Sequence, residues 1–285
     1  MNTARPTEIE PLSNRFLIHP IGEALLPLAI RLQLHPTAVT ATGLIFGLLA
    51  AGAYLRWADW RFATIGLLFM LGWHIMDGLD GKLARATGKT SALGRLLDGV
   101  ADYTAFVAVN LALAFTSPDP QLALAAAILS GVCHILQALF YEGERATYIR
   151  RLAGNFTAIR RSQVGGFIEQ LYNRGESLLG NRTRHFDDAL AAADATERAR
   201  LLHQWRQKTV RIFRLMAPLS ANGRTFAIWV AVLLQNPMLY WIWEILPLTL
   251  LAFGTARALR QAEAGPDSDD KPAAHNTPGA MNGHA

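Results

Sequence analysis

Residues 77–102 read DGLDGKLARATGKTSALGRLLDGVAD, a polar stretch with apolar runs directly on both sides. Two pairs of aspartates lie within it, and the members of each pair are three or four positions apart. Residues at that spacing share one face of a helix. The stretch therefore predicts two helices, each presenting one pair of carboxylates: Asp77 with Asp80, and Asp98 with Asp102.

The turn between the two predicted helices has local signals of its own. Gly88 is a typical residue to follow the end of a helix, because glycine adopts the left-handed conformation found there. Thr90 or Ser91 is a typical N-cap for the second helix. If the two helices pack antiparallel, the two pairs of carboxylates face each other.

Carboxylates that converge in this way favour a bound cation, because each negative charge disfavours ionisation of its neighbours. A set of oxygen ligands without Cys or His suits Mg²⁺, Mn²⁺ or Ca²⁺ rather than zinc. Two such ions about 3.5–4 Å apart could hold a phosphate between them. Gly81 and Gly94 would let a ligand approach the backbone closely. Four basic side chains of the same stretch could bind its phosphate groups: Lys82, Arg85, Lys89 and Arg95.

The stretch resembles the signature of the CDP-alcohol phosphotransferases, D-x2-D-G-x2-A-R-x8-G-x3-D-x3-D. Every defined position of the signature is met, by Asp77, Asp80, Gly81, Ala84, Arg85, Gly94, Asp98 and Asp102. The resemblance implies transfer of a phosphorylated alcohol from a CDP-alcohol to an acceptor hydroxyl, with release of CMP. A structural alternative, two amphipathic helices whose acidic residues are merely solvated, fits poorly with the apolar runs on both sides.

The same resemblance implies roles for individual residues. The metal ligands of a site for two divalent ions, Mg²⁺ or Mn²⁺, would be Asp77, Asp80 and Asp98. Asp102 would be the general base and could also contact metal. The nucleotide-binding set would be Gly81, Ala84, Arg85 and Gly94, with Lys82 as a further candidate at a position that the signature leaves free.

The acceptor-binding residues are less well defined by the sequence. Residues 141–151 read YEGERATYIRR and follow an apolar block, at a place where relatives that use phosphorylated acceptors carry an arginine. Arg145 is the matching candidate, and Arg150 and Arg151 are looser ones. The alternative is that these arginines only follow the general preference for basic residues on the cytosolic side. The sequence therefore leaves the identity of the acceptor open.

Composition predicts an all-α membrane protein. Of the 285 residues, 51% are hydrophobic and 17% are charged, and apolar blocks alternate with short polar joints. The blocks have about 17–25 residues, the length that crosses a bilayer as a helix. Six transmembrane helices are predicted, over approximately residues 38–56, 62–77, 91–115, 121–141, 211–235 and 237–258.

The predicted organisation of the chain follows from these six helices. An amphipathic segment over residues 12–34 would lie in the membrane interface as a helix. Further amphipathic patterns, around residues 165–179 and 186–206, predict helices outside the membrane. The predicted parts are an interfacial segment (1–36), a catalytic transmembrane region (37–145), a cytosolic helical insertion (146–208), C-terminal transmembrane helices (209–260) and a disordered tail (261–285).

Orientation is predicted from the basic residues. With six spans, all of the 27 Lys and Arg residues except Arg56 and Arg61 fall on one side. Such a bias marks the cytosolic side, so the active site and both termini would be cytosolic, in a bacterial inner membrane. The basic excess indicates attraction to anionic lipid and phosphate rather than to nucleic acid. Glu244, inside the sixth span, is either part of a functional site or close enough to the end of the helix to reach the interface.

The favoured function is that of a phospholipid-synthesis enzyme, which moves a phosphatidyl group from CDP-diacylglycerol to a small polar alcohol. One alternative with the same site is an aminoalcohol phosphotransferase that uses CDP-choline or CDP-ethanolamine with diacylglycerol. A remote alternative is a divalent-cation transporter, although transport sites lie near the midplane of the membrane, whereas these aspartates lie near one face. The resemblance also implies a homodimer.

Overall fold

The computed structural model describes residues 6–157 and 183–264. In these residues every regular element is helical and no strand occurs, which confirms the predicted all-α class. The predicted pattern around residues 165–179 and most of the predicted disordered tail lie outside the described residues. The helices are α1 (His19–Arg31), α2 (Pro36–Tyr54), α3 (Trp60–Ala86), α4 (Ala92–Phe115), α5 (Pro120–Leu152), α7 (His185–Ala192), α8 (Ala195–Leu215), α9 (Ala221–Leu233), α10 (Met238–Ile245) and α11 (Pro247–Ala264), with short helical turns η1 (Thr7–Ile9), η2 (Asn14–Ile18) and η3 (Ala217–Leu219).

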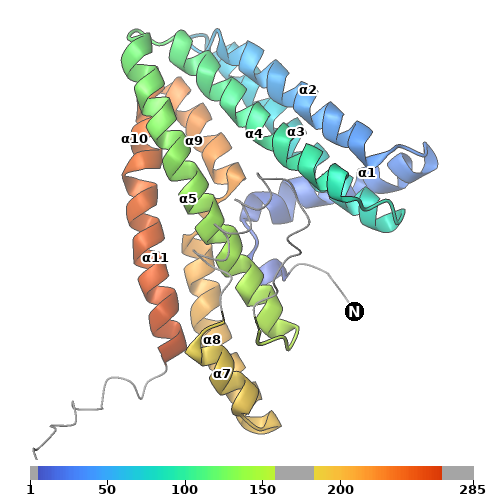
Figure 1. Ribbon diagram of the computed structural model, residues 1–285. Helices are drawn as coiled ribbons and strands as arrows, with labels where there is room; N and C mark the ends of the chain where they lie inside the picture. Colours follow the sequence, from blue (N-terminus) through green and yellow to red (C-terminus); the bar gives the residue numbers. More distant parts are fainter. Residues whose placement is uncertain (1–5, 158–182, 265–285) are drawn as a thin grey trace, which may run out of the picture.

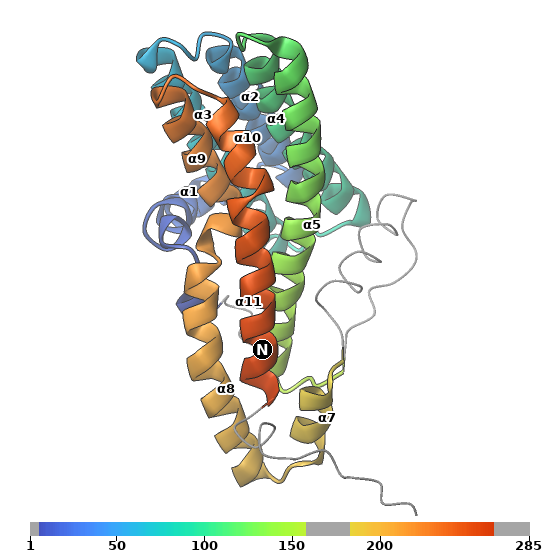
Figure 2. The same ribbon diagram turned by 90° about the vertical axis from the view of Figure 1, so that its left-hand side faces the viewer.

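The helices form two packed regions. In the first, α2, α3 and α4 stand side by side, next to α9, α10 and the first half of α5 (Figure 1). In the second, the ends of α5 and α11 continue beyond this bundle and pack with α7 and α8 (Figure 2). α5 has 33 residues and is therefore about 50 Å long, more than a hydrocarbon core of about 30 Å requires. The helix predicted to cross the membrane up to residue 141 thus continues well past that point.

Five helical segments are long and apolar enough to cross a membrane, among the residues that the structure describes. The predicted multi-pass membrane protein is confirmed at this level. α10 and α11 count as one segment, although the chain bends between them before Pro247. The five segments are Pro36–Tyr54, Trp60–Ala86, Leu93–Phe115, Pro120–Leu152 and Met238–Ala264.

The predicted span over residues 211–235 is wrong as a continuous helix. α8 ends at Leu215, a short turn follows, and α9 begins at Ala221 with only 13 residues. Pro218 lies in the turn and has no backbone N–H for a helical hydrogen bond. Ser220 then caps α9, since its Oγ accepts a hydrogen bond from the Gly223 N–H over 3.2 Å.

α2 packs tightly between α3 and α4, and glycines allow this close approach. A methyl group at Gly43 would lie 3.2 Å from Cβ of Met76 on α3. One turn further along the helix, a methyl group at Gly47 would collide with Cβ of Ala105 on α4. The two helices that carry the motif are therefore held by one central helix, at distances that larger side chains would not permit.

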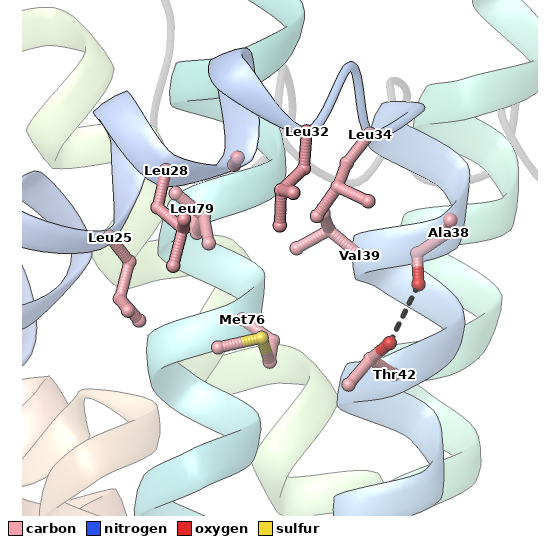
Figure 3. Close-up of a pocket in the computed structure, with 10 residues that line it drawn as sticks. Leu25, Leu28, Leu32, Leu34, Ala38, Val39, Thr42, Met76 and Leu79 are labelled. Atoms are coloured by element: carbon pink, nitrogen blue, oxygen red, sulfur yellow. Dashed lines mark hydrogen bonds between the residues drawn. The ribbon is translucent and has the colours of Figure 1, made fainter.

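α1 runs crosswise to this group, at the end where α2 begins (Figure 1). Lys82 of α3 fastens it, with Nζ 3.1 Å from Oε1 of Glu23. An apolar pocket remains between α1, α2 and α3 (Figure 3). The hydroxyl of Thr42 at its wall donates to the backbone oxygen of Ala38 over 2.9 Å, so the pocket offers a ligand no free hydroxyl proton there.

A substitution at Gly47 tests the close packing of α2. Gly47→Ala is expected to lower the free energy of unfolding by about 1–3 kcal/mol, because the added methyl group pushes α2 and α4 apart. Thermal unfolding of the purified protein in detergent measures this effect. Gly52→Ala is the matched control on the same helix, where a methyl group would meet no atom within 4 Å. Equal melting temperatures for the two variants would contradict the packing described.

Candidate active site

The two motif helices end and begin where the local sequence predicts. α3 ends at Ala86, and Gly88 follows with φ of +67°, in the left-handed region. Ser91 caps α4, with its Oγ accepting a hydrogen bond from the Gly94 N–H over 2.9 Å. Gly94 has no side chain in the way of this cap, since a methyl group there would lie 3.0 Å from the same Oγ. The predicted helix–turn–helix is therefore confirmed.

The structure brings three of the four predicted aspartates together. One carboxylate oxygen each of Asp77, Asp98 and Asp102 lies within 4.8 Å of the others. The fourth, Asp80, is 5% exposed and lies within hydrogen-bonding distance of Asp98. The two pairs of carboxylates thus face each other across α3 and α4, as an antiparallel arrangement of the two helices predicts.

Two further side chains lie against these carboxylates. Oγ1 of Thr40, on α2, donates a hydrogen bond to Oδ2 of Asp80 over 2.5 Å. The indole of Trp73, one turn before the motif on α3, lies beside Asp102. Thr40 and Trp73 both lie outside the 77–102 stretch, so the site extends over three helices.

The arrangement fits a hard divalent cation. Oδ1 of Asp98 is buried and has no hydrogen-bond partner among the described residues. An unpaired buried acceptor of this kind is costly unless a ligand satisfies it. Oxygen atoms from several carboxylates at this separation are the ligands that Mg²⁺ and Mn²⁺ prefer.

The predicted nucleotide-binding residues lie on the part of α3 that follows these carboxylates and at the start of α4. The guanidinium of Arg85 folds back over Gly81, where a methyl group would lie 3.3 Å from its Nη1. Arg85 is exposed at the end of the helix, and Ala84 is half-buried beside it. Lys82 points elsewhere, since its ammonium group contacts α1.

The three predicted acceptor-binding arginines have different surroundings. Arg145 is half-buried on α5, and its Nη1 lies 2.7 Å from Oε1 of Glu142. Arg150 and Arg151 are buried, and both bind Asp187 of α7, with distances of 3.2 Å and 2.8 Å. Of the three, Arg145 is the one whose described ion pair is local to its own helix.

Arg151 belongs to a larger ionic cluster that fastens α7 and α11 to the end of α5. Its guanidinium lies against the rings of Phe186 and Trp205, at 5.1 Å and 5.0 Å from their centroids. Burial raises the pKa of Asp187, but the hydrogen bonds and charge of Arg151, together with hydrogen bonds from Arg150 and the Arg184 N–H, outweigh this effect and hold the pKa below its usual value. The cluster consists of Arg150, Arg151, Arg184, Glu144, Asp187 and Glu263.

A second buried ion pair explains Glu244. This residue is 0% exposed, and its Oε1 accepts a hydrogen bond from Nε of Arg224 over 2.9 Å, so it does not reach the interface. Arg224 also donates to the Leu219 carbonyl in the turn before α9. Gln137 accepts from Arg224 over 2.9 Å and donates to the Glu244 carbonyl near the end of α10. Arg224 and Gln137 thus supply partners to backbone groups at two helix ends inside the bundle.

Comparison with known proteins agrees with this geometry. Residues 33–158 match the family model for CDP-alcohol phosphatidyltransferases. This part of the chain is a CDP-alcohol phosphatidyltransferase region. The chain is also 30% identical, over 130 residues, to the CDP-diacylglycerol–serine O-phosphatidyltransferase of Mycobacterium leprae (strain TN). That match covers 43% of this chain and 42% of the relative, and no solved structure matches the chain.

The CDP-alcohol phosphatidyltransferase match extends from just before α2 to just after α5. It therefore contains all four aspartates, Thr40, Trp73 and Arg145. α7 to α11 lie outside it, including both members of the Arg224–Glu244 pair. The helices that carry the carboxylates thus belong to the shared part of the family, and the ionic pair that supports α9 and α10 lies beyond it.

The role of the Arg224–Glu244 pair is tested by a double-mutant cycle. Arg224→Met leaves a buried carboxylate without its partner and is expected to lower the free energy of unfolding by about 3–5 kcal/mol. Adding Glu244→Gln removes that charge and should restore part of the loss. Thermal unfolding in detergent of the two single variants and the double variant measures the coupling. Strictly additive losses would contradict a direct ionic pairing.

Proposed function

We propose that this protein transfers a phosphatidyl group from CDP-diacylglycerol to the hydroxyl of a small polar alcohol and releases CMP. The observation that carries the proposal is the convergence of Asp77, Asp98 and Asp102, with the exposed Arg85 further along α3. The family match supports the reaction class, and the name of the mycobacterial relative supports CDP-diacylglycerol as donor. Serine, which that name contains, is the first acceptor to test.

In this reaction the acceptor oxygen forms a bond to the phosphorus that carries diacylglycerol, and the bond from that phosphorus to the oxygen of CMP breaks. Asp102 accepts the proton of the attacking hydroxyl, and CMP departs as a phosphate monoester. The indole of Trp73 lies beside the carboxylate of Asp102 and would help to position it for the transfer. Direct attack by the acceptor needs no covalent enzyme intermediate.

Asp77, Asp80, Asp98 and Asp102 would hold two divalent ions, Mg²⁺ or Mn²⁺. When bound, these ions would neutralise the diphosphate and the charge that develops on the leaving CMP. Arg85 would bind a phosphate of the donor, in the space that Gly81, Ala84 and Gly94 leave beside the helices. Lys82 is a weaker candidate, because Glu23 already neutralises it.

For the acceptor, we propose Arg145 rather than Arg150 or Arg151 as a contact. Arg150 and Arg151 are buried in ion pairs with Asp187, and binding an acceptor would require these to break. Arg145 has only a neighbour on its own helix as ion-pair partner in the described structure and is half-buried. A phosphorylated acceptor would suit this arginine, whereas serine would not require it.

We further propose six membrane crossings, with α9 as the fifth. The turn before α10 lies beside the turn between α2 and α3, since Gln235 Nε2 is 3.2 Å from the Ala58 carbonyl oxygen. α8, which precedes α9, packs instead on the far end of α5, where Phe213 contacts the ring of Tyr148. α9 must therefore lead from one end of the bundle to the other. The basic bias supports a cytosolic location, at a bacterial inner membrane, for the motif, both termini and the α7–α8 region.

Two other functions predict different behaviour. An aminoalcohol phosphotransferase would release CMP from CDP-choline or CDP-ethanolamine only when diacylglycerol is present. A divalent-cation transporter would move Mn²⁺ into vesicles without any nucleotide.

A homodimer is also expected from the family resemblance, and the molar mass of the protein in detergent tests it.

The proposal is tested by release of CMP from purified protein in detergent with Mg²⁺ or Mn²⁺ and CDP-diacylglycerol. Serine, glycerol 3-phosphate, inositol, inositol phosphate and choline are tested separately. One of them is expected to stimulate release, and Asp102→Asn should reduce the rate by about 10²–10⁴-fold, because it removes the proton acceptor.

Asp188→Asn is the matched control, since this aspartate is exposed on α7 and remote in sequence from the motif. Its rate should equal that of the wild type. CMP release only from CDP-choline or CDP-ethanolamine would transfer the assignment to the aminoalcohol class. An active Asp102→Asn variant would remove Asp102 from the proposed mechanism.

A further inference from the structure

Thr40 lies outside the 77–102 stretch, yet its hydroxyl contacts one of the carboxylates. Oγ1 is 2.5 Å from Oδ2 of Asp80 and 3.2 Å from the backbone oxygen of Pro36, four residues earlier on the same helix. A hydroxyl has one hydrogen to donate, so the two acceptors compete for it. The shorter distance is typical of a hydroxyl bonded to a charged carboxylate, which assigns the hydrogen to Asp80.

The contact is fixed by the packing of α2 against α3. The two helices run antiparallel. As residue numbers rise along α2, the numbers of the residues that they meet on α3 therefore fall by about the same amount. Gly43 meets Met76 one turn above Thr40, and Tyr54 meets Gly66 at the other end of α2. Thr40 and Asp80 continue this register, so helix packing places the hydroxyl beside the carboxylate.

We infer that Thr40 is a positioning residue for the metal centre, an inference that rests on the proposed function. With Oδ2 of Asp80 bound by the hydroxyl, the carboxylate is fixed beside Asp98 before a ligand arrives. A donor that orients a ligand in this way typically changes metal affinity by about 10–100-fold when it is removed. α2 therefore contributes directly to a centre whose four carboxylates all come from α3 and α4.

Thr42 provides a matched control on the same helix. It lies two positions further along, on the side of α2 that faces the apolar pocket, and its hydroxyl donates to the backbone oxygen of Ala38 (Figure 3). Replacing either threonine by valine keeps the shape of the side chain and removes the hydroxyl. Only Thr40→Val removes a bond to a carboxylate of the site.

The test is Mn²⁺ binding to the purified protein in detergent, without substrates, followed by electron paramagnetic resonance. Thr40→Val and Thr40→Ala are expected to raise the dissociation constant for Mn²⁺ by at least about 10-fold. Thr40→Ser, which keeps the hydroxyl, and Thr42→Val should bind as the wild type does. Melting temperatures in EDTA check that each variant is folded before its affinity is compared.

The outcomes separate this inference from the proposed function. If Asp98→Asn loses Mn²⁺ binding but Thr40→Val and Thr40→Ala keep the wild-type affinity, the role of Thr40 is refuted and the metal centre stands. If both Thr40 variants bind weakly, Thr40→Ser restores binding and no acceptor stimulates CMP release, Thr40 retains its role and the proposed reaction fails. If wild type and Asp98→Asn bind Mn²⁺ equally weakly, both proposals are overturned.

Discussion

The close approach of α2 to α3 and α4 is the constraint on which the site depends. Because Gly43 has no side chain, α3 can contact the backbone of α2, and Gly47 allows α4 the same close approach. α2 therefore sets the positions of both α3 and α4, the helices that carry the carboxylates, and Asp77 can lie close to Asp98 and Asp102. The same approach places Thr40 against Asp80. Small side chains on α2 thus matter to the chemistry, although none of them is reactive.

Helix breaks inside the bundle need their own support, because backbone groups there have no water to bind. The chain breaks before α9 and bends between α10 and α11. Arg224 satisfies a carbonyl at the first position, Gln137 satisfies one at the second, and the two side chains bind each other. Glu244 balances the charge of Arg224. The cost of burying two charges is met here by hydrogen bonds that the broken backbone requires.

Sequence predicted the parts of the structure that depend on local signals. The ends of α3 and α4 follow from Gly88 and Ser91, and the meeting of the carboxylates follows from their helical spacing. The break before α9 was not predicted, because Pro218 stands in a run whose hydropathy alone is continuous enough for a span.

Contacts between residues that are remote in sequence could not be predicted from the sequence either. Arg151 meets Asp187 36 positions later, and Thr40 meets Asp80 40 positions later. The spacing of charges in the chain gives no signal for such pairs, since three-dimensional packing creates them. The basic residues at the end of α5 suggested acceptor binding, whereas the structure engages two of them in ion pairs with Asp187 of α7.

The balance of charge separates the two acidic regions of the molecule. In the cluster at the end of α5, three arginines form ion pairs with three carboxylates, so the positive and negative charges there balance within the protein. In the motif, three carboxylates converge with a fourth beside them, a buried oxygen of Asp98 lacks a partner among the described residues, and Arg85 is exposed. A region that is balanced internally stabilises the fold. A region with surplus negative charge and an unsatisfied buried acceptor is complete only when a cation binds to it.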